Sequence, residues 1–270
     1  NDIEVSSNLF SGKKDSIYIT EKDKSIYLFA GLGKSPDYKT LKTIFRRISA
    51  KQKDHLNNKV ALVIPESFSD ENVEASISGL YLGTYNLGHF KKEKKTHPFL
   101  NADFNLALIS KENFEETAQK AMKLAKAQLE VLKLVDLPPN VATPTYMGNW
   151  AKESGNKHGF TTQIIGKKEA NELGLHAFLS VGKGSKEEPQ FVIMNYVPEN
   201  ANADTKHVGF VGKGITFDTG GLNIKTAGMV HMKCDMAGGA AVLGAMQLIS
   251  DLKLSVKVTA IVPFAENSVD

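Results

Sequence analysis

Apolar and polar residues recur with two different periods along the first hundred residues, and this alternation predicts an α/β fold. Short runs rich in Ile, Val, Tyr and Leu predict strands at residues 16–20, 25–30, 60–64 and 104–110. Apolar residues at helical spacing predict helices at residues 38–52 and 70–83. Strands that alternate with helices in this way predict a parallel or mixed sheet covered by helices.

A long amphipathic segment follows, and we interpret it as a helix that connects two domains. Asn113 is a suitable N-cap, and small and apolar residues continue at helical spacing to about Asp136. The run Leu-Pro-Pro-Asn at residues 137–140 ends this helix, because a proline keeps the preceding residue out of the helical conformation. The predicted organisation is an N-terminal domain at residues 1–112, a linker helix at 113–136 and a second domain at 137–270.

The second domain continues the alternation of helices and strands. Helical spacing predicts helices at residues 143–157, 167–173 and 236–252. Short apolar runs predict strands at residues 161–165, 178–181, 191–196, 208–211 and 257–262. The charged, glycine-rich stretch that begins at residue 212 is predicted to be a loop.

Composition is typical of a globular protein, with 41% apolar and 23% charged residues among 270. The net charge of +3 permits contact with nucleic acid but does not indicate it, because the lysines are spread along the chain. The densest basic run, residues 91–95, is interrupted by an acid. We interpret this run as a solvated loop, with a basic docking patch as the alternative.

Cysteine usage and apolar runs indicate the compartment. A single cysteine, Cys234, excludes an internal disulfide and favours a reducing environment. No run approaches the roughly 20 apolar residues of a membrane span, and the first residues lack the basic and apolar parts of a signal peptide. We therefore expect a cytoplasmic protein without membrane contact.

Two lysines and two aspartates stand among glycines just after the apolar run at residues 208–211: Lys213, Asp218, Lys225 and Asp235. Unpaired buried charges are costly, so we expect a partner, a metal or a substrate to neutralise them. The two aspartates flank a turn and could both reach the carboxyl ends of neighbouring strands, where open α/β sheets bind ligands. Carboxylates suit Zn²⁺, Mn²⁺ or Mg²⁺. By residue type alone, a plain ion-pair cluster is an equal alternative.

Other chemistries lack their motifs. Gly212-Lys213-Gly214 does not have the spacing of a phosphate-binding loop or of a dinucleotide fingerprint. The sequence contains neither a GxSxG nucleophile elbow nor an HExxH zinc motif. We interpret Cys234 as a packed residue rather than a nucleophile, and His231 as a surface histidine rather than a ligand shared with Asp235.

The order GKGITFDTGG, then Lys225, then Asp235-Met236 before Gly238-Gly239-Ala240 resembles the signature of the leucyl (cytosol) aminopeptidase family of two-metal exopeptidases. Four further segments resemble the same family: ISGLYLGTY at 77–85, LPPN at 137–140, AFLSVGKGS at 177–185 and VPFAEN at 262–267. The similarity is continuous from about residue 70 to residue 270, and the first seventy residues match weakly.

The resemblance implies a macro-like α/β N-terminal domain followed by the first half of an α/β catalytic domain, whose mixed sheet is flanked by helices. It implies that Lys213, Asp218 and Asp235 bind two divalent metal ions, with Asp218 bridging both. Lys225 corresponds to the catalytic lysine that polarises the scissile carbonyl, and Met232 to a wall residue of the substrate pocket. Zn²⁺ is the expected ion, with Mn²⁺, Mg²⁺ or Co²⁺ as alternatives. A lysine must lose its proton to bind a metal, which costs about 5 kcal/mol at pH 7, and a strong Lewis acid such as Zn²⁺ offsets this cost most readily.

The implied function is a homohexameric aminopeptidase that releases N-terminal residues, preferably leucine-like, from peptides with a free N-terminus. The chain departs from the family pattern at residues 226–228, where it is one residue shorter. The family's second ligand motif, with an arginine for a bicarbonate-like anion, is absent from residues 1–270, so we expect these residues alone to be inactive. The alternatives are a DNA- or partner-binding protein that uses a basic N-terminal domain, and a structural remnant without metal.

Overall fold

The computed structural model describes residues 5–88, 90–92 and 96–269. The chain divides into two compact units, residues 1–126 and 127–270, and the division falls inside the long helix α3 (Glu115–Asp136). The domain limits expected from the sequence, at residues 112 and 136, stay a prediction. In the described part of the chain, no helix is long and apolar enough to cross a membrane. The basic run at residues 91–95 lies partly outside the described residues.

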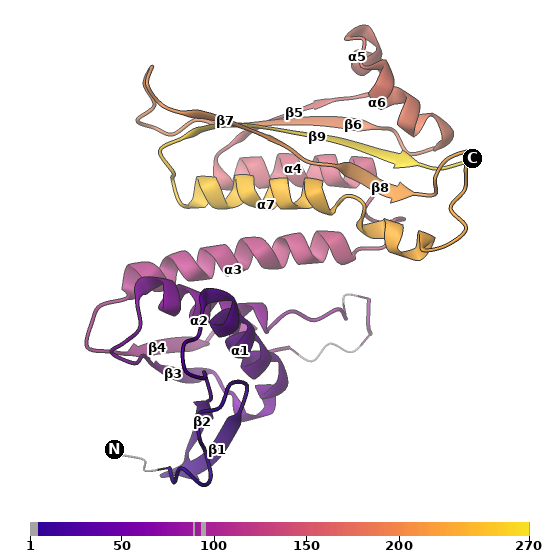
Figure 1. Cartoon of the computed structure of the whole chain (residues 1–270). Coiled ribbons are helices and arrows are strands. Elements are labelled where there is room, and N and C mark those ends of the chain that lie inside the picture. The colour runs from indigo at the N-terminus through magenta and orange to yellow at the C-terminus, as the bar shows by residue number, and fades with distance from the viewer. Residues whose placement is uncertain (1–4, 89, 93–95, 270) are drawn as a thin grey trace. The chain divides into compact units, whose positions relative to one another are not determined.

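The first unit combines two pairs of strands with helices (Figure 1). Its elements are β1 (Ile17–Lys22), β2 (Ser25–Ala30), α1 (Tyr38–Lys51), β3 (Lys59–Val63), α2 (Asp70–Leu82), β4 (Asn105–Ile109) and the first part of α3. Strands β1 and β2 form an antiparallel hairpin, and β3 lies parallel to β4. Leu41, Ile44 and Ile48 recur at helical spacing along α1 and are buried, because the apolar face of this helix forms the core of the unit.

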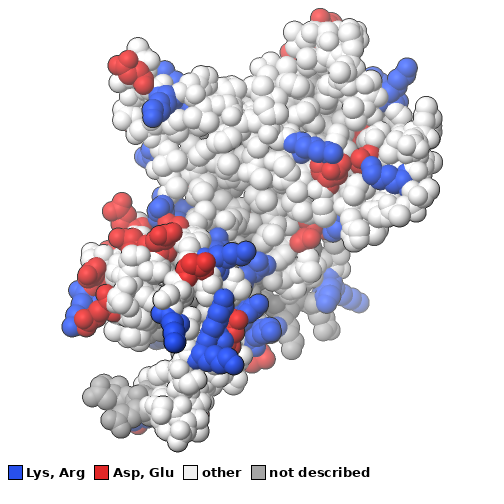
Figure 2. All heavy atoms as spheres, in the orientation of Figure 1, with Lys and Arg blue, Asp and Glu red and all other residues white. Residues whose placement is uncertain are grey.

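The first unit carries the basic excess of the chain, with 20 Lys and Arg residues against 16 Asp and Glu. Figure 2 shows acidic and basic side chains interspersed on the visible face. Arg47 pairs with Asp15 at 2.8 Å, and Lys120 pairs with Glu74 at 2.8 Å. The visible surface therefore has mixed charge rather than the continuous basic stripe of a nucleic-acid interface.

The second unit is built on one mixed sheet of five strands. Its strands are β5 (Thr161–Ile165), β6 (Gln190–Tyr196), β7 (His207–Val211), β8 (Gly214–Asp218) and β9 (Lys257–Asn267). Its helices are α4 (Pro144–His158), α5 (Lys167–Glu172), α6 (His176–Val181) and α7 (Ala237–Asp251). Helices α4 and α7 cover one face of the sheet, and α5 and α6 lie on the other side (Figure 1). The expected α/β fold with a mixed sheet and helical cover is confirmed.

Strand β9 contributes four residues to the core between the sheet and the helices. Val258, Ala260, Val262 and Phe264 alternate along β9 and are fully buried or nearly so. This is the period of two that places every second side chain on one face of a strand. Strand β9 is antiparallel to β6 on one edge and parallel to β7 and β8 on the other.

Strands β7 and β8 follow each other along the same edge of β9, with a break between them. The last pair of β7 joins Val211 to Ile261, and the first pair of β8 joins Gly214 to Phe264. Pro263 of β9 stands opposite this break, and a proline has no backbone N–H to give to a ladder. Gly212 N still donates to Ile261 O of β9 at 3.0 Å, whereas the carbonyl oxygen of Lys213 is left for a contact outside the sheet.

The structure corrects three expectations about secondary structure. Residues 178–181, expected as a strand, belong to helix α6, because a short apolar run does not distinguish the two types and Leu179 N donates to Leu175 O as in a helix. Residues 214–218, expected as part of a loop, form strand β8. Strand β9, expected to end at residue 262, continues to Asn267, because β6 pairs with it as far as Phe264 and β8 pairs with it from Phe264 to Asn267.

Candidate active site

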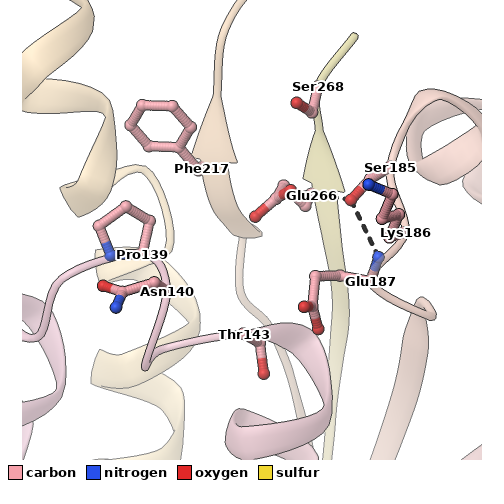
Figure 3. Close-up of a pocket in the computed structure, with 9 residues that line it drawn as sticks. All are labelled: Pro139, Asn140, Thr143, Ser185, Lys186, Glu187, Phe217, Glu266 and Ser268. Carbon is pink, nitrogen blue, oxygen red and sulfur yellow. Dashed lines mark hydrogen bonds between the residues drawn. The ribbon is translucent and has the colours of Figure 1, made fainter. Parts of the chain in front are cut away.

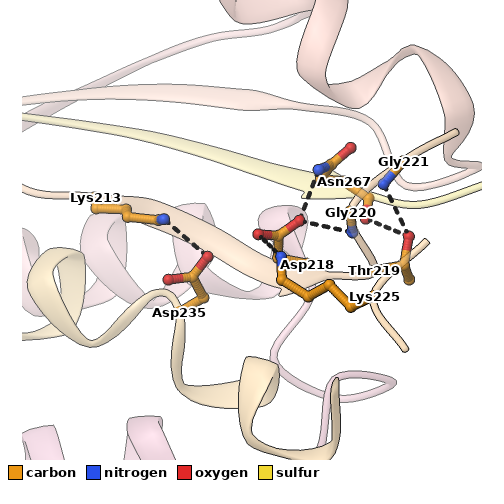
Figure 4. Close-up of polar contacts among 8 residues, drawn as sticks. All are labelled: Lys213, Asp218, Thr219, Gly220, Gly221, Lys225, Asp235 and Asn267. Atoms are coloured by element: carbon orange, nitrogen blue, oxygen red, sulfur yellow. Dashed lines mark hydrogen bonds and ion pairs between the residues drawn. The ribbon is translucent and has the colours of Figure 1, made fainter. Parts of the chain in front are cut away.

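The four charged residues singled out in the sequence form two ion pairs at one end of the sheet (Figure 4). Lys225 Nζ lies 2.5 Å from Asp218 Oδ2, and Lys213 Nζ lies 2.9 Å from Asp235 Oδ2. Asp218 ends strand β8, whereas Asp235 lies in the turn before helix α7 rather than at the end of a neighbouring strand. These contacts agree with the hypothesis of a plain ion-pair cluster. They do not exclude a metal site, because each lysine occupies a position next to a carboxylate where a metal cation could also bind.

Asp218 is held by three donors. Lys225 Nζ faces Oδ2, while Gly220 N at 3.0 Å and Asn267 Nδ2 at 2.6 Å both donate to Oδ1. Burial opposes ionisation of this side chain, but the hydrogen bonds from Lys225, Gly220 and Asn267 outweigh it and lower the pKa of Asp218 below its ordinary value. Asp218 is therefore a carboxylate at neutral pH, ready to face a cation.

The turn after β8 brings these donors to the carboxylate. Gly220 and Gly221 have φ of +93° and +64°, a conformation that glycine adopts without steric cost. Lys225 N donates to Thr219 O at 2.8 Å, which closes the turn and returns the chain toward Asp218. The glycines after Asp218 in the sequence motif thus have a structural reason, since they form the loop that places Lys225 opposite Asp218.

The second glycine pair of the motif lets helix α7 approach the break between β7 and β8. Gly239 N donates to Lys213 O at 2.7 Å, a contact that uses the backbone freed from the sheet. A Cβ atom added at Gly212 would lie 2.8 Å from Gly238 O and 2.8 Å from Gly239 Cα. Small residues on both sides therefore allow the backbone contact that holds Lys213 beside the start of α7.

Gly212→Ala is expected to lower the free energy of unfolding of the second unit by about 1–3 kcal/mol, because the new methyl group would push against the backbone of α7. Urea unfolding followed by the fluorescence of Trp150, which packs on the core of this unit, measures the effect. Gly209→Ala is the matched control on β7, since a Cβ there meets nothing within 4 Å, and we expect a change within about 0.5 kcal/mol. Equal stabilities of the two variants would contradict the close approach.

The surroundings of Asp235 indicate whether these side chains could coordinate a metal ion. Its Oδ2 atom is buried and receives no hydrogen bond of good geometry, although Lys213 Nζ lies 2.9 Å away. A buried carboxylate oxygen that lacks a well-aligned hydrogen bond suits a cation. However, in the part of the chain that the structure describes, no three His, Cys, Asp or Glu side chains gather into one site. The described residues therefore fit a metal as part of a ligand set, not as a complete one.

Three other residues considered in the sequence lie in the short 3₁₀ helix η4 (Met229–Cys234). Met232 is half-buried, and its carbonyl oxygen accepts from Asp235 N at 3.2 Å. His231 is exposed, and a 3₁₀ helix does not align residues i and i+4, so the structure does not favour a shared site of His231 with Asp235. Cys234 Sγ donates to Val135 O at 3.8 Å, which agrees with a packed thiol.

A pocket of about 310 Å³ lies beside this cluster (Figure 3). Phe217 and Glu266 line it, and each directly precedes a residue of the cluster, Asp218 or Asn267. Ser185 Oγ donates to Glu266 Oε1 at 2.8 Å across the pocket wall. None of the four paired lysines and aspartates lines this pocket.

Residues 131–270, which hold both ion pairs, the glycine turn and the pocket, match the model of the cytosol aminopeptidase family, catalytic domain. The chain belongs to this family. A probable cytosol aminopeptidase of Treponema denticola is 33% identical over 268 residues, which are 97% of this chain and 56% of the relative. The chain spans about half the length of the curated relatives it matches.

Solved structures of other proteins share the fold of this family member. The bottromycin maturation enzyme BotP in complex with Mn superposes with a TM-score of 0.85 at 24% identity, over all of this chain and 58% of that one. A mutant of tomato leucine aminopeptidase gives a TM-score of 0.82 at 23% identity, over 97% of this chain and 52% of that one. The fold of both units is therefore that of known proteins.

Sequence reasoning missed one residue that the structure adds to the site of this cytosol aminopeptidase family member. Asn267 contacts Asp218 from strand β9, 49 residues away along the chain. The run VPFAEN contains Asn267, but a single asparagine at the end of a strand does not reveal which side chain it meets. Only the pairing of Asp218 with Asn267 in the register of β8 and β9 brings them together.

Proposed function

We propose that the protein that contains this chain is a metal-dependent aminopeptidase, which releases N-terminal residues, preferably leucine-like, from peptides with a free N-terminus. The observation that carries this proposal is the Asp218 carboxylate, which is ionised, held by three donors and opposed by Lys225 within the family's catalytic segment. A carboxylate beside a lysine provides both a ligand for a cation and a donor for a carbonyl oxygen.

Lys213, Asp218 and Asp235 would hold the metal. We propose two ions, with Asp218 as the carboxylate shared between them, and Zn²⁺ as the preferred ion, with Mn²⁺, Mg²⁺ or Co²⁺ as alternatives. When bound, such ions supply Lewis acidity for the attack of water on a peptide carbonyl. BotP, a protein of the same fold, has been solved in complex with Mn, which supports a divalent ion.

Lys225 has a separate role in this proposal. Its side chain is 30% exposed and its Nζ reaches Asp218, so it can contact both the carboxylate and a bound peptide. A positive charge at this point stabilises the negative charge that develops on the carbonyl oxygen in the transition state. Asp218 keeps Lys225 in place, because the two side chains attract each other while the site awaits substrate.

The remaining features of the proposal concern substrate, assembly and location. Met232, three residues before Asp235, is proposed to form part of the wall that contacts the N-terminal side chain of the substrate. It does not line the 310 Å³ pocket described above. We propose a homohexamer and a cytoplasmic location, and the name of the cytosol aminopeptidase relatives supports the location. Nucleic-acid binding through the first unit stays a prediction, and the interspersed charges of Figure 2 do not favour it.

Lys225→Ala is expected to lower kcat by about 100- to 1000-fold while bound metal is retained, because one donor to the developing oxyanion is worth about 2.7–4 kcal/mol. Hydrolysis of leucine p-nitroanilide by the full-length protein and its metal content, measured by emission spectroscopy, test this prediction. Lys233→Ala is the matched control, since Lys233 is a half-buried lysine of the same region that contacts Asp136 instead.

Two outcomes would contradict this role of Lys225. An unchanged kcat would mean that the shortened loop at residues 226–228 has moved Lys225 away from the substrate. Loss of metal together with activity would mean that Lys225 maintains the metal site rather than the transition state. If Lys233→Ala has the kcat of the wild type, the loss of a nearby lysine does not by itself lower kcat, and the effect is specific to Lys225.

A further inference from the structure

Asn267 is tied to the strand that carries Asp218 through its backbone as well as its side chain. It is the last residue of β9 and pairs with Asp218 in the parallel ladder of β8 and β9. Its backbone oxygen accepts from Thr219 N at 2.9 Å and from Thr219 Oγ1 at 3.0 Å. Its Nδ2 donates to Asp218 Oδ1 at 2.6 Å (Figure 4). The residue therefore lies in one position relative to Asp218.

The turn after β8 leaves room for this amide. A Cβ atom added at Gly221 would lie 3.1 Å from Asn267 Oδ1, so any larger residue there would press on the side chain. Gly221 also has a φ of +64°, which a residue with a side chain rarely adopts. The same glycine thus forms the turn and makes space for the asparagine that faces Asp218.

The donors around Asp218 are divided between its two oxygens. Oδ1 receives only neutral donors, Gly220 N and Asn267 Nδ2, whereas Oδ2 faces the charged Lys225. A hydrogen bond from a neutral amide can persist when a cation approaches, but Lys225 and a cation compete for the same charge. Oδ2 is therefore the oxygen available to a cation, and Oδ1 is the oxygen that fixes the orientation of the carboxylate.

We propose that Asn267 is a positioning residue for Asp218, which holds Oδ1 so that the carboxylate presents Oδ2 to a divalent cation. This inference rests on the proposed function. The terminal torsion of an aspartate is broad, so the carboxylate turns easily unless hydrogen bonds restrain it. Without Asn267 only Gly220 N restrains Oδ1, and the carboxylate samples orientations that do not bind the cation.

The test measures Mn²⁺ binding by calorimetry on the full-length protein after removal of metal. Residues that hydrogen-bond to a metal ligand typically contribute 10- to 100-fold to metal affinity. Asn267→Ala is therefore expected to weaken Mn²⁺ binding by about 10- to 100-fold. Asn267→Leu keeps roughly the size of the side chain and the backbone contacts to Thr219 but removes the donor, and it is expected to weaken Mn²⁺ binding as well.

The control separates positioning from a general effect on the sheet. Asn195 of β6 is also half-buried, and its Oδ1 accepts from Thr259 Oγ1 at 2.7 Å, away from Asp218. Asn195→Ala is expected to leave Mn²⁺ affinity unchanged, whatever it does to the urea midpoint. Wild-type affinity in both Asn267 variants, or equal loss in Asn195→Ala, would overturn the positioning role alone. A wild-type protein that binds no Mn²⁺ would overturn the proposed function and this role with it.

Discussion

Asp218→Ala is expected to abolish aminopeptidase activity of the full-length protein and to release bound metal. Residues that only support a ligand contribute 10- to 100-fold, so loss of a carboxylate that we propose to be shared by two ions should cost more than about 100-fold in kcat/KM. The variant also leaves Lys225 without the carboxylate that lies 2.5 Å from its Nζ. Activity on leucine p-nitroanilide and metal content by emission spectroscopy measure both effects.

Two further variants sharpen this result. Asp218→Asn keeps the shape of the side chain and removes its charge, so it is expected to lose activity as Asp218→Ala does. Asp204→Ala removes an exposed aspartate of the same unit and should behave as the wild type. Metal content equal to the wild type in Asp218→Ala would contradict the bridging role, even if activity were lost.

A protein made only of residues 1–270 is expected to show no aminopeptidase turnover. In the chain as far as the structure describes it, no three His, Cys, Asp or Glu side chains gather, and the two aspartates of the site each face a lysine. Such a donor set can hold at most one ion weakly, whereas the proposed chemistry uses two. The purified protein is assayed with a leucine anilide in excess Zn²⁺, Mn²⁺ or Co²⁺.

The Lys213→Ala variant of this shorter protein supplies the background for that assay. It removes a proposed ligand and the ion-pair partner of Asp235, and it leaves the Asp218–Lys225 pair in place. Equal rates in the two proteins would agree with the prediction. Metal-dependent turnover above the background would show that Lys213, Asp218 and Asp235 are a sufficient ligand set, and the account of an incomplete site would be wrong.

The two lysines explain why residue types alone did not distinguish a metal site from a plain ion-pair cluster. Each carboxylate is matched by one lysine, so the cluster is close to neutral and can be stable without an ion. Lys213 balances the charge of Asp235 as well, but the buried Oδ2 atom of Asp235 lacks a hydrogen bond of good geometry. Family membership then favours the metal reading, because the catalytic-domain match covers this cluster.

Local sequence patterns predicted most elements of both units but failed for one short apolar run and for two strands whose limits depend on tertiary pairing. The run at residues 178–181 is apolar and short, and its helix depends on the bond from Leu179 N to Leu175 O outside the run. Strand β8 contains a glycine and an aspartate that resemble a loop, and it is a strand because β9 pairs with it. Strand β9 passes through Pro263, which local rules interpret as an end.

The sequence by itself determined the α/β class through its hydrophobic period, and the family through the order of residues in its motifs. It also singled out the charged residues of the candidate site. Only the tertiary structure decided which charges meet: Lys225 with Asp218, and Lys213 with Asp235. It also added Asn267, since the parallel register of β8 and β9 sets that contact across 49 residues. Contacts of this kind depend on strand register and on turn geometry, which no local pattern of residue types specifies.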